Sequence, residues 1–104
     1  MNGRKNYKIY LDDVIRIIVY FLSDGNEILK FVVKIEYFYN NEWIEMERYD
    51  CYHDCIHKDI LNKKGKKKRQ IKYVLADLKS GLNFAIKEFK ENYKFILWRF
   101  LNED

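Results

Sequence analysis

The sequence predicts a single α+β domain, residues 1–104, made of an antiparallel meander of four to five strands with one long C-terminal helix packed on one face. Two hairpin turn signals divide the first half of the chain into short apolar segments. From residue 77 onward, apolar residues instead recur at every third or fourth position, as on one face of a helix. A chain of this length can bury one core but not two.

The strands are expected at residues 14–23, 28–39, 43–50, 55–61 and 69–74. The first is apolar on both faces, as in a central strand. Asp24-Gly25 predicts the hairpin turn that follows, because such turns require the positive φ that glycine tolerates. Residues 40–42 predict a second turn, and the lysine-rich residues 62–68 join the last two strands.

The helix is expected from about Asp77, as N-cap, to Leu101. Its core-facing stripe consists of Leu78, Leu82, Ala85, Phe89, Tyr93, Ile96 and Phe100. Further apolar residues lie off this stripe, namely Phe84, Phe95, Trp98 and Leu101. Exposed apolar area of this kind marks a partner surface, and the expected partner is a second copy, in a homodimer.

Composition narrows the class of protein. The chain is 48% hydrophobic and 17% aromatic, which excludes a disordered chain. Its net charge of +4 is concentrated between residues 58 and 72, which favours a polyanionic partner such as RNA or another nucleic acid. No apolar run reaches the length of a membrane span, and the two cysteines form no disulfide framework. A cytoplasmic protein without a signal peptide is therefore expected.

The residues that suggest chemistry gather between Glu47 and Ile60, which hold both histidines and both cysteines. Arg48 and Asp50 share the strand parity of Ile44 and Met46, so they are expected to point toward the interior beneath the helix. A buried charge needs a partner. One interpretation is a structural Arg48–Asp50 ion pair that pins the following turn. The other is a cleft in which Arg48 binds phosphate.

Strand geometry argues against a zinc site. Cys51, His53, Cys55 and His57 alternate, but residues two and four apart on a strand are separated by ~6.5 Å and ~13 Å, too far for four ligands of one ion. A manganese or magnesium site made of Asp50, His53, His57 and Asp59 is a weaker alternative. We expect no metal and no cofactor.

Two histidines beside an arginine instead resemble the parts of a metal-independent ribonuclease. One imidazole would remove the 2′-hydroxyl proton and the other would protonate the leaving oxygen, while Arg48 or Lys58 would stabilise the charged phosphorane. The candidate catalytic residues are Arg48, Asp50, His53, His57 and Asp59. The alternative for the histidines is a surface turn without catalytic function.

The lysine run is the candidate nucleic-acid-binding segment, made of Lys58, Lys63, Lys64, Lys66, Lys67, Lys68 and Arg69. It contains no aromatic residue, so base stacking would have to come from elsewhere, for instance Tyr49 or Tyr52. A competing hypothesis is a non-catalytic module that binds nucleic acid or an acidic protein through this hairpin. In that case the histidines would be dispensable.

Residues 28–100 resemble an uncharacterised family of small archaeal and bacterial proteins. The motif that carries the resemblance is Arg48-Tyr49-Asp50, then His53, then His57-x-Asp59, followed by the C-terminal helix. The departure is Asp54, where that family often has glycine. The same motif is similar to TumE-type proteins of toxin–antitoxin pairs. The resemblance implies a toxin-like context, with a cognate antitoxin as a partner.

Overall fold

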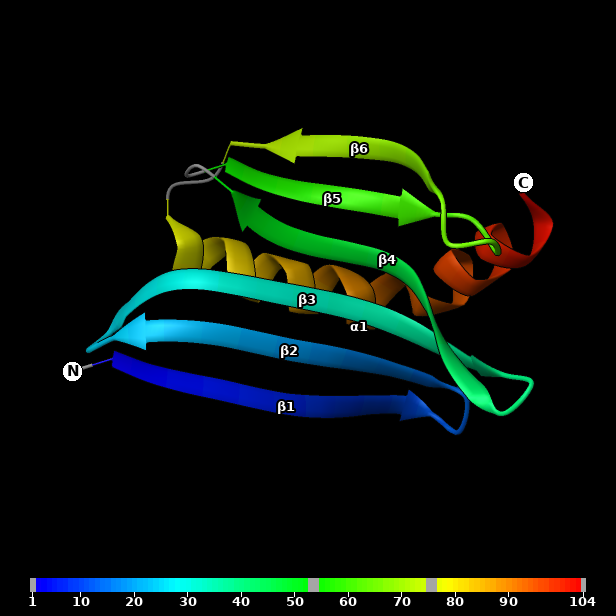
Figure 1. Ribbon diagram of the computed structural model, residues 1–104, viewed down its shortest axis with the longest axis horizontal. Helices are drawn as coiled ribbons and strands as arrows, with labels where there is room; N and C mark the ends of the chain where they lie inside the picture. Colours follow the sequence, from blue (N-terminus) through cyan, green and yellow to red (C-terminus); the bar gives the residue numbers. More distant parts are fainter. Residues whose placement is uncertain (1, 53–54, 75–76, 104) are drawn as a thin grey trace.

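The computed structural model describes residues 2–52, 55–74 and 77–103. Six strands form one antiparallel sheet in the order of the sequence, and α1 covers one side of it (Figure 1). The strands are β1 (Asn2–Asp12), β2 (Ile15–Asp24), β3 (Glu27–Tyr39), β4 (Glu42–Tyr52), β5 (Cys55–Leu61) and β6 (Lys67–Tyr73), and the helix is α1 (Leu78–Asn102).

The α+β class and the single C-terminal helix are confirmed, whereas the number of strands differs from the prediction of four to five. The additional strand is β1, which pairs along its length with β2 at one edge of the sheet. Its sequence is mostly polar, with only Ile9 and Leu11 packed against the core. A strand that buries so little has no clear apolar alternation, which is why the pattern does not predict it.

The predicted turns and helix boundaries agree with the structure within two residues. Gly25 has a φ of 60°, and Asn40 and Asn41 have φ values of 54° and 67°. Such left-handed pairs match the right-handed twist of a hairpin. Asp77 caps α1, since its carboxylate accepts a hydrogen bond from the backbone nitrogen of Ser80 at 2.7 Å.

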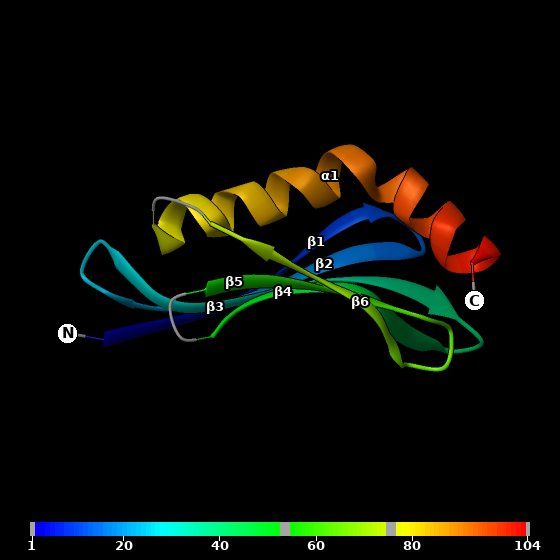
Figure 2. The ribbon, with the colours of Figure 1, turned by 90° about the horizontal axis from the view of Figure 1, so that it is seen from above.

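The core lies between α1 and the side of the sheet that we call the helix face (Figure 2). Its largest members on the sheet include Phe31 and Tyr49, and those on α1 include Phe89 and Ile96, all fully or almost fully buried. Among the described residues, no helix has an apolar stretch long enough to cross a membrane.

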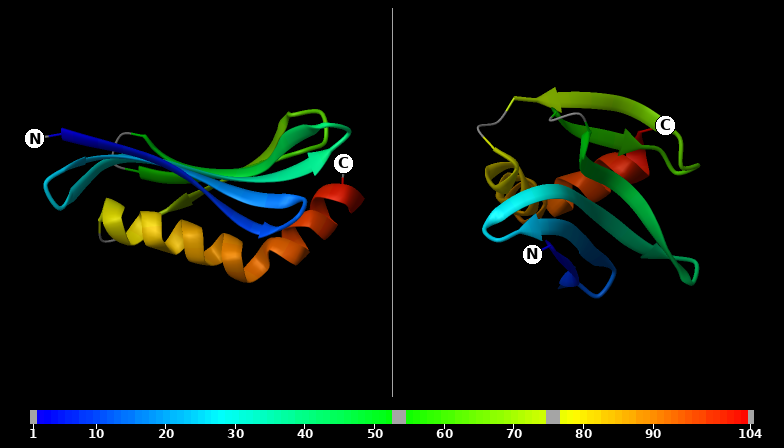
Figure 3. Two further views of the ribbon diagram at one scale, coloured as in Figure 1. Left: turned by 90° about the horizontal axis from the view of Figure 1, so that it is seen from below. Right: turned by 60° about the vertical axis from the view of Figure 1, so that its left-hand side comes forward.

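The other side of the sheet carries no helix, and we call it the open face (Figure 3). Residues paired across antiparallel strands project to the same side, so the strand register assigns each residue to a face. Two central rows of the open face are Lys34–Arg48–Asp59–Gln70 and Val32–Asp50–His57–Lys72.

Candidate nucleic-acid interface

A bulge in β4 decides where the predicted site residues lie. Ile35 pairs with Glu47 and Glu36 pairs with Glu45, so Met46 is an extra residue that has no partner on β3. One extra residue reverses the side-chain parity of a strand. Met46 and Glu47 are therefore both buried on the helix face.

The expectation that Arg48 and Asp50 point toward the helix is wrong for this reason. Beyond the bulge they pair with Lys34 and Val32 of β3, which places both on the open face. Tyr49 takes the buried position between them. Tyr49 is thus also unavailable for base stacking, and the predicted turn-pinning pair of Arg48 with Asp50 is replaced by another contact.

That contact is with Glu45. The Arg48 guanidinium donates to both carboxylate oxygens of Glu45, from Nε at 3.0 Å and from Nη2 at 3.2 Å. Lys34 lies 3.7 Å from the same carboxylate. Two cations thus share the single carboxylate of Glu45 on the open face.

Four of the five predicted catalytic residues meet on the open face. Arg48 pairs directly with Asp59, and Asp50 pairs directly with His57. Paired side chains in an antiparallel sheet have Cβ atoms about 4.5–5.5 Å apart. The fifth residue, His53, lies outside the described residues.

A shallow hollow of about 400 Å³ lies over three of these residues, Asp50, His57 and Asp59, whereas Arg48 is not part of its lining. Its lining consists of Lys30, Val32, Asp50, Cys51, His57, Asp59, Lys67 and Gln70. Lys30 and Gln70 are polar members of this lining that the sequence does not predict. They come from β3 and β6, which the sheet order places on either side of β4 and β5, so no local motif could have identified them.

His57 has unused hydrogen-bonding capacity in this hollow. Its Nδ1 atom is buried and has no hydrogen-bond partner among the described residues. By contrast, Asp59 accepts a hydrogen bond from Gln70 at 2.9 Å and lies 3.3 Å from the Nζ of Lys67. A buried polar atom left unpaired requires an explanation, and a catalytic or ligand-binding role is one.

Lys58 is not part of the cationic surface. It pairs with Tyr49 on the helix face and is 7% exposed. Its Nζ lies 2.8 Å from Oε1 of Glu47 and 2.5 Å from Oε1 of Glu88 on α1. Lys58 therefore joins the sheet to the helix and is unavailable to a nucleic acid or to a phosphorane.

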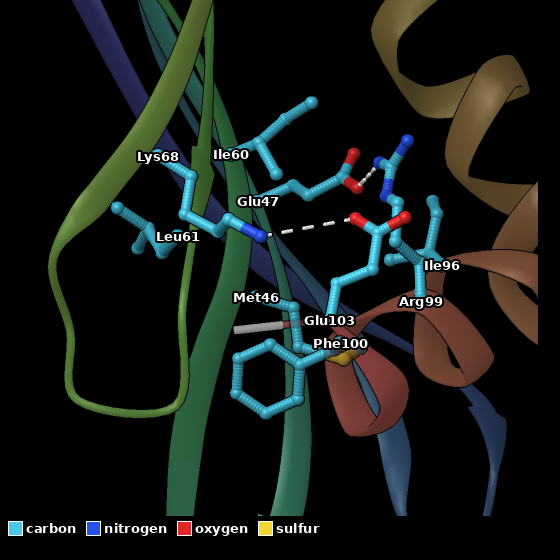
Figure 4. Close-up of a pocket in the computed structure, with 9 residues that line it drawn as sticks. All are labelled: Met46, Glu47, Ile60, Leu61, Lys68, Ile96, Arg99, Phe100 and Glu103. Atoms are coloured by element: carbon cyan, nitrogen blue, oxygen red, sulfur yellow. Dashed lines mark hydrogen bonds and ion pairs between the residues drawn. The ribbon is translucent and has the colours of Figure 1, made fainter.

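Further contacts complete this buried network. Glu47 also binds Arg99 of α1, which is drawn in Figure 4, and Tyr49 donates a hydrogen bond to Glu88 at 2.6 Å. Burial by itself lowers the pKa of Lys58, but the carboxylates of Glu47 and Glu88 outweigh it and hold that pKa above its ordinary value. Burial, followed by the hydrogen bond to Glu88, strongly raises the pKa of Tyr49. The network thus has two positive and two negative side chains.

The turn between β5 and β6 presents the remaining lysines. The Asn62 side chain accepts hydrogen bonds from the backbone nitrogens of Lys64 at 2.9 Å and Lys66 at 3.0 Å, and Gly65 takes a φ of 79°. These bonds fix a compact turn. Lys63, Lys64 and Lys66 are all exposed on it.

The two lysines after the turn are directed differently. Lys67 reaches the hollow of the open face. Lys68 instead extends toward the end of α1, where its Nζ lies 3.9 Å from Glu103 (Figure 4). The exposed base Arg69 pairs with Ile60, on the helix-face side of the sheet. The cationic hairpin that faces solvent is therefore Lys63, Lys64, Lys66 and Lys67.

Within the described part of the chain, no three histidine, cysteine or acidic side chains converge closely enough to hold a metal ion. Cys51 is engaged with the backbone of Phe31, whose nitrogen donates to Sγ at 3.2 Å. Burial raises the pKa of the Cys51 thiol, which disfavours the thiolate that a metal would need. His53, which belongs to the alternative manganese or magnesium set, lies outside this part of the chain.

Comparison with known proteins gives a family without an assigned activity. No curated protein matches the chain, and no solved structure matches it either. The similarity to TumE-type proteins therefore stays a prediction. A family model described as a domain of unknown function, DUF7718, matches residues 1–104, so the chain belongs to the DUF7718 family.

Proposed function

We propose that this protein binds RNA through the cationic hairpin and the adjoining hollow of the open face. The observation that carries the proposal is the position of the hairpin, whose Lys67 lines a hollow that α1 leaves uncovered. Lysines held on a fixed turn attract phosphates without reading sequence. Lys30, Lys34 and Lys72 extend the positive charge across the open face.

The test is the salt dependence of RNA binding. We choose an unstructured, fluorescently labelled RNA and measure its anisotropy with increasing protein at several salt concentrations. Replacing Lys63, Lys64 and Lys66 together by glutamate is expected to weaken binding. It should also lower the slope of log K against log salt by about 2, since each phosphate contact on a single strand contributes about 0.7.

A matched control makes the same change of charge on the opposite side of the molecule. Lys79, Lys87 and Lys90 are exposed on α1, away from the open face. Their replacement by glutamate should leave the slope close to that of the wild type. Equal losses in the two triple variants would show that only net charge matters, and would refute an interface at the hairpin.

RNA cleavage is a second candidate, favoured by the meeting of Asp50, His57 and Asp59 around one hollow. In this reaction His57 accepts the 2′-hydroxyl proton, the 2′-oxygen bonds to phosphorus, and the bond to the 5′-oxygen breaks as that oxygen gains a proton. The expected proton donor is His53. Lys67 replaces Lys58 as the cation near the phosphorane, because Lys58 is buried.

One variant, His57→Ala, distinguishes RNA cleavage from RNA binding. His57→Ala should lower the rate of RNA cleavage by about 10²-fold or more, while RNA binding by anisotropy stays within a factor of about two of the wild type. The product to detect is a 2′,3′-cyclic phosphate. If no RNA of any sequence is cut, the protein is the non-catalytic binding module. A toxin–antitoxin role predicts growth arrest on expression, relieved by His57→Ala.

A further inference from the structure

A second hollow lies on the side of the cationic hairpin away from the hollow of the open face. It has a volume of about 350 Å³, within the range of small-ligand pockets. Its lining consists of Tyr37, Tyr39, Asn40, Glu42, Ile44, Lys63, Phe100 and Leu101. The β3–β4 turn, the β5–β6 turn and the C-terminal end of α1 thus all contribute to it.

One wall of this hollow is a pair of stacked tyrosines, one of which is largely exposed. Tyr37 and Tyr39 are two residues apart on β3, with ring centroids 6.0 Å apart and planes inclined by only 21°. Tyr37 is partly buried against the core, whereas Tyr39 is 59% exposed. A largely exposed ring of this kind can stack with a flat aromatic ligand.

The remaining walls suit a nucleobase. Ile44, Phe100 and Leu101 supply apolar contact, as expected for a pocket that takes a flat ring. The Asn40 amide and the Glu42 carboxylate offer the donors and acceptors that recognise base edges. The backbone of Asn40 takes a left-handed conformation in the β3–β4 turn, with a φ of 54°.

Lys63 connects this hollow to the proposed RNA-binding surface. It lines the hollow and also belongs to the turn that carries Lys64 and Lys66. A stacking ring next to a row of lysines is the usual arrangement in proteins that bind single strands. Tyr39 in this hollow also supplies the aromatic group that the lysine run lacks.

We infer that this hollow binds an unpaired nucleobase of single-stranded RNA whose phosphates lie on the cationic hairpin. The inference rests on the proposed RNA binding and adds the class of RNA. A base in a duplex is already stacked and paired, so only single-stranded RNA can place a base on Tyr39.

The test compares two tyrosines of equal exposure. Tyr39→Ala should weaken the binding of a labelled single-stranded RNA of about 12 nucleotides by about 5- to 150-fold, the range typical for loss of one base–aromatic stack. Tyr10→Ala is the matched control, since Tyr10 is also 59% exposed but lies on β1, outside the hollow. Tyr39→Trp keeps an aromatic ring at this position and should bind the RNA about as well as the wild type. The salt slope should not change in Tyr39→Ala, because no charge is lost.

An abasic oligomer of the same length separates this inference from the proposed function. It keeps the phosphates, so it should bind the wild type and Tyr39→Ala equally, and about as weakly as RNA binds Tyr39→Ala. If wild type binds no RNA, both proposals fail. If the hairpin variant loses binding but Tyr39→Ala does not, only the base site is wrong.

Two further results would also overturn the base site. One is tighter binding of duplex RNA than of the single strand, with the same dependence on Tyr39. The other is a change from dimer to monomer in Tyr39→Ala, measured by light scattering, because this would assign the hollow to a second copy of the chain. Circular dichroism melting of each variant checks that the fold is retained.

Discussion

Lys58 provides the sharpest test of how the helix is held on the sheet. Its ammonium lies between the carboxylates of Glu47 and Glu88, and both it and Glu47 are almost completely buried. Lys58→Met keeps most of the side-chain volume and removes the charge. It leaves two carboxylates beneath α1 with one guanidinium, that of Arg99, so the network has an uncompensated negative charge.

The expected cost follows from this imbalance. Removing one partner of a buried ion pair destabilises a protein by about 3–5 kcal/mol, because the remaining charge stays buried without compensation. Lys58 has two such partners at 2.8 and 2.5 Å, so the loss should fall within this range and not near the ~1 kcal/mol of a surface pair. Domains of this size have a total free energy of unfolding of about 5–15 kcal/mol.

The assay is urea unfolding at pH 7, followed by far-ultraviolet circular dichroism. The matched control is Lys58→Met combined with Glu88→Gln, which removes one charge of each sign. The amide oxygen introduced by Glu88→Gln can still accept the hydrogen bond from Tyr49, and Glu47 keeps Arg99. The double variant should regain about 2 kcal/mol or more relative to Lys58→Met.

The contribution of Lys58 to the stability of the fold depends on pH in a definite direction. Because the pKa of Lys58 is raised in the folded protein, the unfolded chain loses this proton first, near pH 10.5. The stabilisation is therefore complete below that pH and is lost as the pH rises through the higher folded pKa. The stability gap between wild type and Lys58→Met should narrow only above about pH 10. A loss below ~1 kcal/mol at pH 7, or equal losses in the single and double variants, would refute this reasoning.

Three further outcomes are expected. Asp77→Ala should lower the melting temperature and Asp77→Asn should not, because asparagine also caps a helix; equal melting temperatures would contradict the role of the cap. Cys51→Ser together with Cys55→Ser should leave RNA binding unchanged, because the Cys51 side chain packs against the core and contacts the Phe31 backbone, although the residue lines the open-face hollow. Chelators should also have no effect, and metal bound stoichiometrically to the purified protein would contradict this. Trp98→Glu should convert a homodimer to a monomer in light scattering, because Trp98 and Phe95 are 57% and 56% exposed on α1; a monomeric wild type would reject self-association.

Most of the fold follows from local patterns. The start of the helix and the hairpin turns are set by residues close in sequence, such as Asp77, Gly25 and the pair Asn40-Asn41. Strand β1 is the exception. It pairs with the edge of β2 that would otherwise be exposed. A polar edge strand satisfies backbone hydrogen bonds in this way without burying an apolar face. Pairing of that kind leaves little trace in a single sequence.

The candidate site shows a different limit of prediction from the sequence. Nothing near Met46 in the sequence reveals that it is a bulge residue, and without the bulge Arg48 and Asp50 would face the helix. For Lys58 the sequence does contain a signal. It stands between Ile56 and Ile60 at the same parity, and both isoleucines are buried. The surrounding lysines obscure this alternation, and for that reason the charge pattern groups Lys58 with the exposed cationic residues.

The bulge has a consequence for any experiment on this protein. Alternate residues of β4 and β5 belong to two separate systems, with Tyr49 and Lys58 in the buried network and Asp50 and His57 on the open face. Loss of activity in a Tyr49 or Lys58 variant would therefore follow from a weakened fold and would say nothing about RNA. A role in RNA binding or cleavage can be assigned only to variants of the open-face residues that unfold at the same urea concentration as the wild type.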